Sequence, residues 1–545
     1  MSPIITCGTH LAHLLDAYGV RHVFGIPGVH NVELYRGLPQ TRIRHISPRH
    51  EQGAGFMADG YARSTGKPGV AFVITGPGLT NIATAMGQAY ADSVPMLVIA
   101  AVNKRHQLGL GRGFLHEMPN QHNLAAGLTT FTHTLLSPRE LPDVLAAAFS
   151  VFSSSRPRPV VIEIPIDVME EKVEVDLPPS ISSRISAPGP DPDAIGAAAK
   201  LLSGAKRVML LAGGGAQGAA AELTALAEKL GAVVQLTTNA RGLLPPHHPQ
   251  LADFGIGKDA GRLVMDQADA VLAIGTEIGE TDYDFYSTKP FVVGTKYIRI
   301  DIDPRQIAIG HTRPDIGIIS DARLAAAALD AVLKPGTPDK AWAKDAVNRL
   351  SRIAATSREP EDPLYDKLLT TIRDACVDPI LVGDSTKAVY RGGLTYRSPK
   401  TRSFFSASTG FGTLGYALPA AIGAKVANPD RPVIALAGDG GAQFTFPELI
   451  SAREAEAGIV MIVWNNNGYR EIRDYMVSQE IAPIAVDPIP PDFVKSAEAM
   501  GVAAKRVETF DQLAAALRGH DRSAKLPLLL EAGPWIGVNG RAQYA

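Results

Sequence analysis

Cysteine is nearly absent from this sequence, because only Cys7 and Cys376 occur among its 545 residues. Two cysteines cannot form a disulfide framework, so we expect a reducing, cytoplasmic setting. An excess of charge of one sign is lacking as well: 53 Lys and Arg residues against 55 Asp and Glu residues give a net charge of −2. A nucleic acid or an anionic membrane surface would need a basic patch. The composition therefore predicts neither partner.

Long apolar runs are also missing. No run approaches the roughly 20 residues needed to cross a bilayer, and Met1–His10 lacks the basic and then apolar pattern of a signal peptide. We see no short repeat and no low-complexity tract. With 46% hydrophobic residues, the chain is long enough for two to four domains with substantial cores. We therefore expect a soluble cytoplasmic protein of several domains.

Short strand-like runs alternate with helix-like runs along the sequence, which favours an α/β fold with mainly parallel sheets flanked by helices. Two stretches interrupt this alternation. Leu177–Pro192 has the proline- and serine-rich composition of a linker, and Lys334–Asp339 begins a polar helical passage that ends near Glu359–Pro363. These interruptions predict three domains, which cover residues 1–175, 190–335 and 360–545.

Two apolar, β-branched runs near the C-terminal end each finish in a polar turn. Pro432–Ala437 leads into Gly438–Gly440, and Ile459–Trp464 leads into Asn465–Tyr469. We expect both runs to be buried parallel strands, with Phe446–Ala457 as the helix between them. Loops at the carboxyl ends of neighbouring parallel strands face one crevice, where Asp, Asn and backbone carbonyl oxygens suit Mg²⁺ beside a diphosphate. On local grounds, two ordinary turns explain the pattern equally well.

The pairing of these turns resembles the thiamine diphosphate motif of the acetohydroxyacid synthase and 2-oxo acid decarboxylase family. In that family the Asp, the second Asn and the carbonyl two residues beyond hold the metal, which implies Asp439, Asn466 and Gly468 here. The resemblance covers nearly the full length. It implies an N-terminal pyrimidine-binding domain, a Rossmann-like central domain and a C-terminal diphosphate-binding domain, with thiamine diphosphate and Mg²⁺ as cofactors.

The segment Arg49–Arg63 follows the strand-like run Ile43–Ile46, and we expect it to start a helix. A glutamate at this point is also favoured by the helix dipole alone. The segment closely resembles the catalytic glutamate segment of the family, with Glu51 on the glutamate. The resemblance implies that Glu51 exchanges a proton with N1′ of the aminopyrimidine, so that the 4′-imino group can remove the C2 proton of the thiazolium.

Three further segments resemble cofactor-binding parts of the family. Val70–Asn81 is a strand with a Gly-Pro-Gly turn that would border the pyrimidine, and Gly383–Lys387 would bind diphosphate oxygens. Ser406–Ala424 places Leu414 where the family has a Met wedge that bends the cofactor. Each segment could also be a plain turn, a helix cap or a helix start. The implied cofactor neighbours are Gly76, Gly78, Asn81, Ser385, Thr386, Gly412, Leu414, Gly438, Gly440, Gly441, Ala442 and Tyr469.

A glycine-rich loop, Gly213–Gly218, follows the strand-like run Val208–Ala212 and has the spacing of a dinucleotide-binding loop. A single match of this kind is weak, and the next strand, Val233–Thr238, lacks the expected acidic residue. The FAD-binding synthases usually carry Met-His-Gly after this strand, whereas this chain has Ala252–Gly257. We therefore expect no FAD.

The residues that would decide the substrate depart from the synthases. Where the synthases have Phe-Gln-Glu, this chain has Asn120–His122, and Ile74 replaces a histidine of the mandelate-pathway decarboxylase. The paired histidines of pyruvate decarboxylases are also missing. Gly111–Glu117 and Glu277–Tyr283, together with His50–Tyr61, look most like 5-guanidino-2-oxopentanoate (2-ketoarginine) decarboxylases. The resemblance therefore favours decarboxylation of this 2-oxo acid to 4-guanidinobutanal and CO₂.

A guanidinium tail needs a carboxylate partner, ideally a bidentate one. Glu117 and Glu471 could each supply it, and each could equally form a local salt bridge. The candidate residues of the substrate pocket are Val29, His30, His116, Glu117, Gln121, Glu471 and Ile472.

Other functions remain open at this point. An acetolactate synthase-like carboligase, which joins two units derived from 2-oxo acids, fits the same motifs. A dehydrogenase would rest on Gly213–Gly218 alone, and a non-catalytic homologue would be expected to lack Glu51 or Asp439, which are both present. In relatives the pyrimidine domain of one subunit meets the diphosphate domain of another. The resemblance therefore implies at least a homodimer, and we expect a homotetramer.

Overall fold

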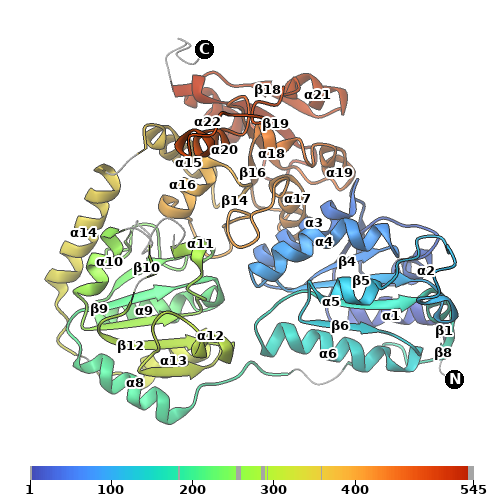
Figure 1. The fold of residues 1–545 in the computed structure, drawn as a ribbon, viewed down its shortest axis with the longest axis horizontal. Helices are drawn as coiled ribbons and strands as arrows, with labels where there is room; N and C mark the ends of the chain where they lie inside the picture. The colour runs from blue at the N-terminus through green and yellow to red at the C-terminus, as the bar shows by residue number, and fades with distance from the viewer. Residues whose placement is uncertain are drawn as a thin grey trace.

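Three parallel sheets flanked by helices make up the protein, as the sequence predicts (Figure 1). The computed structural model describes residues 3–181, 185–252, 259–283, 289–290, 292–334, 336–356 and 359–537. In Figure 1 the N-terminal sheet lies at the lower right, the central sheet at the lower left and the C-terminal sheet above them. Within the described residues, no helix has the length and apolar character that a membrane crossing requires.

The N-terminal sheet has the strand order β3-β2-β4-β5-β7-β6, and all its neighbouring strands are parallel. Every residue of β4, β5 and β7 is buried, as in parallel strands covered on both faces. The strands are β2 (His22–Gly25), β3 (Arg44–Ile46), β4 (Gly69–Val73), β5 (Met96–Val102), β6 (Phe131–Thr134) and β7 (Val160–Pro165), with an antiparallel ribbon of β1 (Ile4–Thr6) and β8 (Lys172–Glu174). The helices are α1 (Cys7–Ala17), α2 (Val32–Tyr35), α3 (Glu51–Thr65), α4 (Pro77–Ala91), α5 (Gln121–Ala126), α6 (Leu141–Ser154) and α7 (Ile166–Glu170), with short 3₁₀ turns η1 (Leu38–Gln40), η2 (Arg105–Gln107) and η3 (Pro138–Glu140).

The central sheet has five parallel strands in the order β10-β9-β11-β12-β13. They are β9 (Val208–Ala212), β10 (Val233–Leu236), β11 (Ala270–Ile274), β12 (Lys296–Asp301) and β13 (Ile316–Ile319). The helices are α8 (Pro192–Gly204), α9 (Ala220–Leu230), α10 (Asp259–Asp266), α11 (Glu280–Tyr283), α12 (Pro304–Ala308), α13 (Ala322–Val332) and α14 (Lys340–Thr356), with 3₁₀ turns η4 (Gly214–Ala216) and η5 (Thr238–Ala240).

The C-terminal sheet has six parallel strands in the order β15-β14-β16-β17-β19-β18. They are β14 (Ile380–Gly383), β15 (Phe404–Ser406), β16 (Val433–Gly438), β17 (Val460–Trp464), β18 (Ala503–Arg506) and β19 (Leu528–Ala532). The helices are α15 (Asp362–Ala375), α16 (Lys387–Thr395), α17 (Ala417–Ala427), α18 (Asp439–Ala442), α19 (Glu448–Glu454), α20 (Arg470–Ser478), α21 (Phe493–Ala499) and α22 (Phe510–Gly519), with the 3₁₀ turn η6 (Pro534–Gly537).

The N-terminal and C-terminal sheets share one topology. In each sheet, the second strand of the chain lies at one edge and is followed by the first, third, fourth, sixth and fifth strands. The strand order therefore reverses between β2 and β4 in one sheet and between β14 and β16 in the other. Ligands of open α/β sheets bind beyond the carboxyl ends of the strands at such a switch point. The turns that follow these four strands are thus the places where the fold favours a site.

Helices α3 and α17 join these two sheets, and their contact requires glycine. A Cβ atom on Gly60 would lie 2.0 Å from the carbonyl oxygen of Ala420, and one on Gly423 would lie 1.9 Å from that of Met57. The two backbones therefore touch directly. One hydrophobic core runs from the N-terminal sheet through both helices into the C-terminal sheet, whereas the central sheet has separate cores.

Two elements differ from the expected ones. The helix expected over Phe446–Ala457 is shorter, because Pro447 stands at the N-cap of α19 and Glu456 leaves the helical region with a φ of 52°. Gly438–Gly440 is not a simple turn, since Asp439 begins the short helix α18.

Candidate active site

The predicted metal ligands come together at the carboxyl ends of β16 and β17. Asp439 begins α18, and its carboxylate is buried at 1% exposure. The backbone N–H of Asn466 donates to Oδ1 at 3.3 Å, and that of Gly468 donates to Oδ2 at 2.8 Å. Burial raises the pKa of Asp439, and these N–H donors partly oppose the rise. The loop after β17 therefore wraps around the carboxylate.

The side-chain amide of Asn466 faces the Gly468 carbonyl oxygen and Asp439 Oδ1, each at 3.1 Å, and in the orientation that satisfies its hydrogen bonds its nitrogen donates to both. Turned over, the amide presents its oxygen beside the same two oxygens, which is the arrangement that a bound cation would favour. Ligands at about 2.1 Å from an octahedral Mg²⁺ lie about 3.0 Å from one another. This set of one carboxylate, one amide and one carbonyl therefore fits Mg²⁺, with further positions for water and phosphate oxygens.

The Gly468 carbonyl is aimed by a backbone that only glycine adopts easily. Its φ is 131°, and a Cβ atom there would lie 2.5 Å from the carbonyl oxygen of Val486. The described residues contain no cluster of three His, Cys, Asp or Glu side chains that could hold a metal ion. A metal at this site would therefore depend on the mixed oxygen set.

The predicted diphosphate cradle surrounds α18. A Cβ atom on Gly440 would lie 2.4 Å from the ring of Tyr469, so the ring packs directly on the helix. Gly438 lies beside Thr386, and Gly441 lies beside Leu414. Ala442 is buried, and Gly412 is exposed with a φ of 71°.

Asp384, within the segment Gly383–Lys387, is a buried carboxylate at the centre of this cradle. Its two carboxylate oxygens accept the N–H of Ser385 at 2.8 Å and of Ala417 at 3.3 Å. Burial raises the pKa of Asp384 to about 6, against the effect of these donors. The hydroxyl of Ser385 donates to the Thr413 carbonyl at 3.2 Å. Asp384 thereby fixes the loop after β14 to the start of α17.

A second group of predicted residues lies at the switch point of the N-terminal sheet. Glu51 is the first residue of α3 and is 9% exposed, and the side-chain amide of Asn81 donates to its Oε2 at 2.9 Å. In the turn after β4, Gly76 has a φ of 65° and lies against His116, while Gly78 packs on Ile74. The turn and the glutamate are thus held together through α4.

Gln121 supports this turn, and the two predicted pocket histidines lie beside it. Gln121 Oε1 accepts the N–H of Gly76 at 2.9 Å and the hydroxyl of Thr75 at 2.8 Å. The rings of His30 and His116 have their centroids 4.8 Å apart, and burial lowers the pKa of His30. Val29 is exposed.

The two carboxylates proposed for a guanidinium each have a neighbour of opposite charge or hydrogen-bond donors of their own. Glu117 accepts the N–H groups of Gly111 and Gly113 at 2.8 Å and thereby shapes its own loop. Glu471 lies on α20, none of whose residues is buried, with its Oε2 3.8 Å from Lys387 Nζ. Ile472 is also exposed.

Comparisons with known proteins agree with this arrangement. Family models match residues 5–124 (thiamine pyrophosphate enzyme, N-terminal TPP binding domain), 195–329 (central domain) and 382–532 (C-terminal TPP binding domain). A Pseudomonas aeruginosa protein named probable 2-ketoarginine decarboxylase is 44% identical over 94% of this chain and 91% of its own length.

The chain belongs to the thiamine pyrophosphate enzyme family.

More distant members include the large subunit of acetolactate synthase isozyme 1 from Escherichia coli, 32% identical over 84% of this chain and 81% of that protein. A probable acetolactate synthase large subunit from Methanocaldococcus jannaschii is 32% identical over 97% of this chain and 93% of that protein. The resemblance stated from the sequence is therefore confirmed, and the protein is an enzyme of this family.

Glu163 is the main residue of the site region that sequence reasoning missed. It lies on β7 at 1% exposure, and its Oε1 accepts the Gln121 side-chain N–H at 3.0 Å. Its Oε2 accepts the Thr134 hydroxyl at 2.8 Å and lies 3.0 Å from His122 Nδ1. A single acidic residue inside the apolar run Val160–Pro165 was the signal that could have revealed it.

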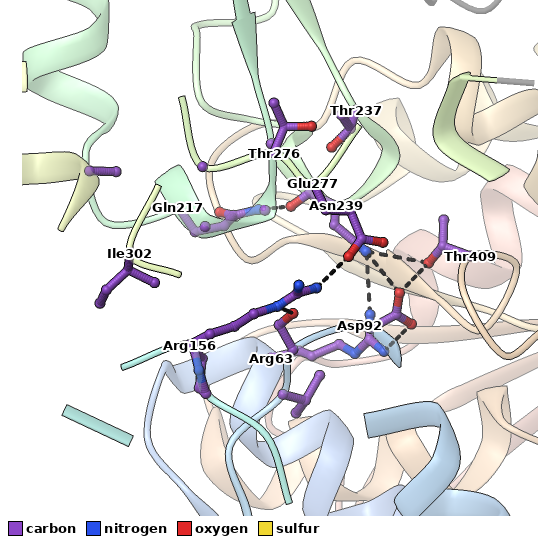
Figure 2. Close-up of a pocket in the computed structure, with 18 of the residues that line it drawn as sticks. Arg63, Asp92, Arg156, Gln217, Thr237, Asn239, Thr276, Glu277, Ile302 and Thr409 are labelled. Carbon is purple, nitrogen blue, oxygen red and sulfur yellow. Dashed lines mark hydrogen bonds and ion pairs between the residues drawn. The ribbon is translucent and has the colours of Figure 1, made fainter. Parts of the chain in front are cut away.

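The glycine-rich loop of the central domain borders a cavity of about 390 Å³ between all three domains (Figure 2). Asp92 links the three domains through its carboxylate. Its Oδ1 accepts hydrogen bonds from the Asn239 side-chain amide at 3.2 Å and the Thr409 hydroxyl at 2.8 Å, and its Oδ2 accepts one from Arg63 Nη2 at 2.7 Å. Arg156 and Glu277 form an ion pair beside this network. Residues 253–257, on which the expectation of no FAD partly rests, lie outside the described residues. That expectation stays a prediction.

Proposed function

We propose that this enzyme catalyses the thiamine diphosphate-dependent decarboxylation of 5-guanidino-2-oxopentanoate to 4-guanidinobutanal and CO₂. The observation that carries the proposal is the 44% identity, over 94% of the chain, to a protein named probable 2-ketoarginine decarboxylase. The reaction consumes one proton and needs no oxidant.

The charge of a neighbouring cavity supports a cationic substrate. This cavity of about 250 Å³ is lined by Thr75, Glu117, Gln121 and Glu163, and its described lining contains no lysine or arginine. Thr75 and Gln121 contact the turn at Gly76, so the cavity lies next to the pyrimidine side of the site. A buried guanidinium is stable only beside a carboxylate. We therefore add Glu163 to the proposed carboxylate partners Glu117 and Glu471, because Glu163 and Glu117 both line this cavity.

The proposed roles of the residues follow from their contacts. Thiamine diphosphate, when bound, supplies a nucleophilic carbon and an electron sink for the loss of CO₂. Asp439, Asn466 and the Gly468 carbonyl would hold Mg²⁺, and Glu51, oriented by Asn81, would exchange a proton with the pyrimidine N1′. The remaining cofactor-lining residues of the proposal are Gly76, Gly78, Ser385, Thr386, Gly412, Leu414, Gly438, Gly440, Gly441, Ala442 and Tyr469.

A homodimer, in which the Glu51 half-site of one chain faces the Asp439 half-site of another, completes this proposal. The family resemblance supports it, because in relatives the pyrimidine domain of one subunit meets the diphosphate domain of another. We further propose a homotetramer, a cytoplasmic location, and the domain division 1–175, 190–335 and 360–545.

Carboligation of the acetolactate type is the second candidate, supported by relatives 32% identical over most of the chain. Both reactions begin with decarboxylation of a 2-oxo acid, so product analysis separates them. The purified protein, with thiamine diphosphate and Mg²⁺, is incubated with 5-guanidino-2-oxopentanoate, 2-oxohexanoate or pyruvate, and CO₂ and organic products are measured. We expect 4-guanidinobutanal and the highest kcat/KM from the guanidino acid. Equal rates across the panel, or acetolactate from pyruvate as the main product, would contradict the proposal.

A further inference from the structure

A carboxylate of the C-terminal domain reaches the start of the helix that carries Glu51. Glu448 begins α19 and is 1% exposed. Its Oε1 accepts the backbone N–H of Arg49 at 2.9 Å and that of His50 at 3.2 Å. These are the two residues before Glu51, the first residue of α3. Figure 1 shows α19 close to this end of the N-terminal domain.

The start of α3 needs such an acceptor. N–H groups at the beginning of a helix have no partner within it, and the helix dipole favours a negative charge there. The His50 ring already accepts the N–H of Gln52 at 3.1 Å. Glu448 satisfies the two preceding N–H groups from another domain.

The close approach depends on Gly53. A Cβ atom on Gly53 would lie 2.3 Å from Glu448 Oε1, so any larger residue at position 53 would displace the carboxylate. Two more contacts tie the same segment to the end of α19: Arg49 pairs with Glu454, and Arg44 Nη2 donates to the Ala455 carbonyl at 2.7 Å. The segment before Glu51 is thus fixed by α19 rather than by its own domain alone.

We propose that Glu448 is a positioning residue, which sets the place of the Glu51 carboxyl by holding the two amides in front of it. The proposal rests on the proposed role of Glu51 in proton exchange with the cofactor. A displacement of about 1 Å in a catalytic group lowers rates by up to roughly 100-fold. Loss of the Glu448 carboxylate should therefore act on the proton-transfer rate and leave binding of cofactor and substrate nearly unchanged.

The test measures the exchange of the C2 proton of bound thiamine diphosphate for deuterium, together with kcat, KM and the cofactor Kd. Glu448→Ala should slow C2 exchange and kcat by about 10- to 100-fold, with KM and Kd within about threefold of wild type. Glu448→Gln keeps an oxygen that accepts both N–H groups and should restore most of the rate. Arg453→Ala, on the same helix, is the matched control and should change little, because Arg453 is exposed and donates to the Met500 carbonyl rather than to the segment before Glu51.

Gly53→Ala provides a second route that keeps Glu448, in case the alanine variant does not fold. Its added methyl group should displace the carboxylate and slow C2 exchange in the same way. The proposal is overturned if Glu448→Ala or Gly53→Ala exchanges at the wild-type rate, if KM and Kd rise as much as kcat falls, or if Glu448→Gln is as slow as Glu448→Ala. If the wild-type protein exchanges the C2 proton but decarboxylates none of the 2-oxo acids, the proposed substrate is refuted and the test of Glu448 remains valid. Wild-type protein that does not accelerate exchange would refute the role of Glu51, and this proposal with it.

Discussion

Replacing Glu163 by glutamine separates the charge of the small cavity from its hydrogen bonds. The carboxylate accepts from Gln121 through Oε1, and its Oε2 contacts Thr134 and His122. A glutamine can keep the first bond through its oxygen. Its amide nitrogen can donate to the Thr134 hydroxyl and to an unprotonated His122 Nδ1, because both atoms also act as acceptors. The substitution therefore removes one negative charge and leaves no buried polar atom without a partner.

The expected effect falls on one class of substrate. A hydrogen bond to a charged group contributes about 2 to 3 kcal/mol, so kcat/KM for 5-guanidino-2-oxopentanoate should fall roughly 30- to 150-fold. For 2-oxohexanoate, which has no cation, kcat/KM should stay within about threefold or rise. Steady-state assays of CO₂ release with both acids give the ratio, and Glu140→Gln serves as a control, since Glu140 is partly exposed and pairs with His133. An equal loss for both acids would show that Glu163 only supports the fold, and no loss would show that the guanidinium binds elsewhere.

Four other substitutions test the site and the fold. Glu51→Gln should lower kcat by roughly 10²- to 10⁴-fold, while the Kd for thiamine diphosphate stays within a few-fold of the wild-type value. Full activity of this variant would contradict the role of Glu51 in proton exchange. Asp439→Asn removes the only carboxylate of the oxygen set and should raise the cofactor Kd at least about tenfold at limiting Mg²⁺, as measured by fluorescence titration. Because burial raises the pKa of Asp384 from 3.8 to about 6, the folded state binds its proton more tightly, and stability falls as pH rises from about 4 to 6. Between pH 4 and pH 7, the stability of Asp384→Asn relative to wild type should therefore increase by about 2 to 3 kcal/mol. Urea titrations at the two pH values that show no such increase would contradict the raised pKa of Asp384. Gly423→Ala, whose Cβ would lie 1.9 Å from the Met57 carbonyl oxygen, should destabilise the apo protein by about 1 to 3 kcal/mol, and an unchanged urea midpoint would contradict the close contact.

The fold class and the family could be predicted because their signals are local. Short apolar strands with polar or glycine-rich turns at their carboxyl ends identify parallel sheets and the loops that face a crevice. The loop after β17 illustrates this, since Asn466 and Gly468 lie a few residues from the strand end that positions them. The turn with Gly76 is local in the same way.

The residues that the sequence missed depend on contacts between distant segments. Glu163 acquires its hydrogen-bond partners only when the fold brings Gln121 and Thr134 against β7. Glu448 contacts amides that lie almost 400 positions earlier in the chain, with separations of 399 and 398 residues. The roles of Glu117 and Glu471 stay predictions, because their neighbours lie in a loop and on another helix that no local sequence pattern specifies.

The continuous core beneath α3 and α17 has a practical consequence for exchanging parts between relatives. A fragment that ends before the C-terminal sheet would expose the apolar face against which α3 packs, so the two outer sheets should be transplanted only as a pair. The central domain has cores made of its own residues and those of α14, so we expect it to be the better candidate for exchange, provided that the contacts of Asn239 and Arg241 with the other domains are kept.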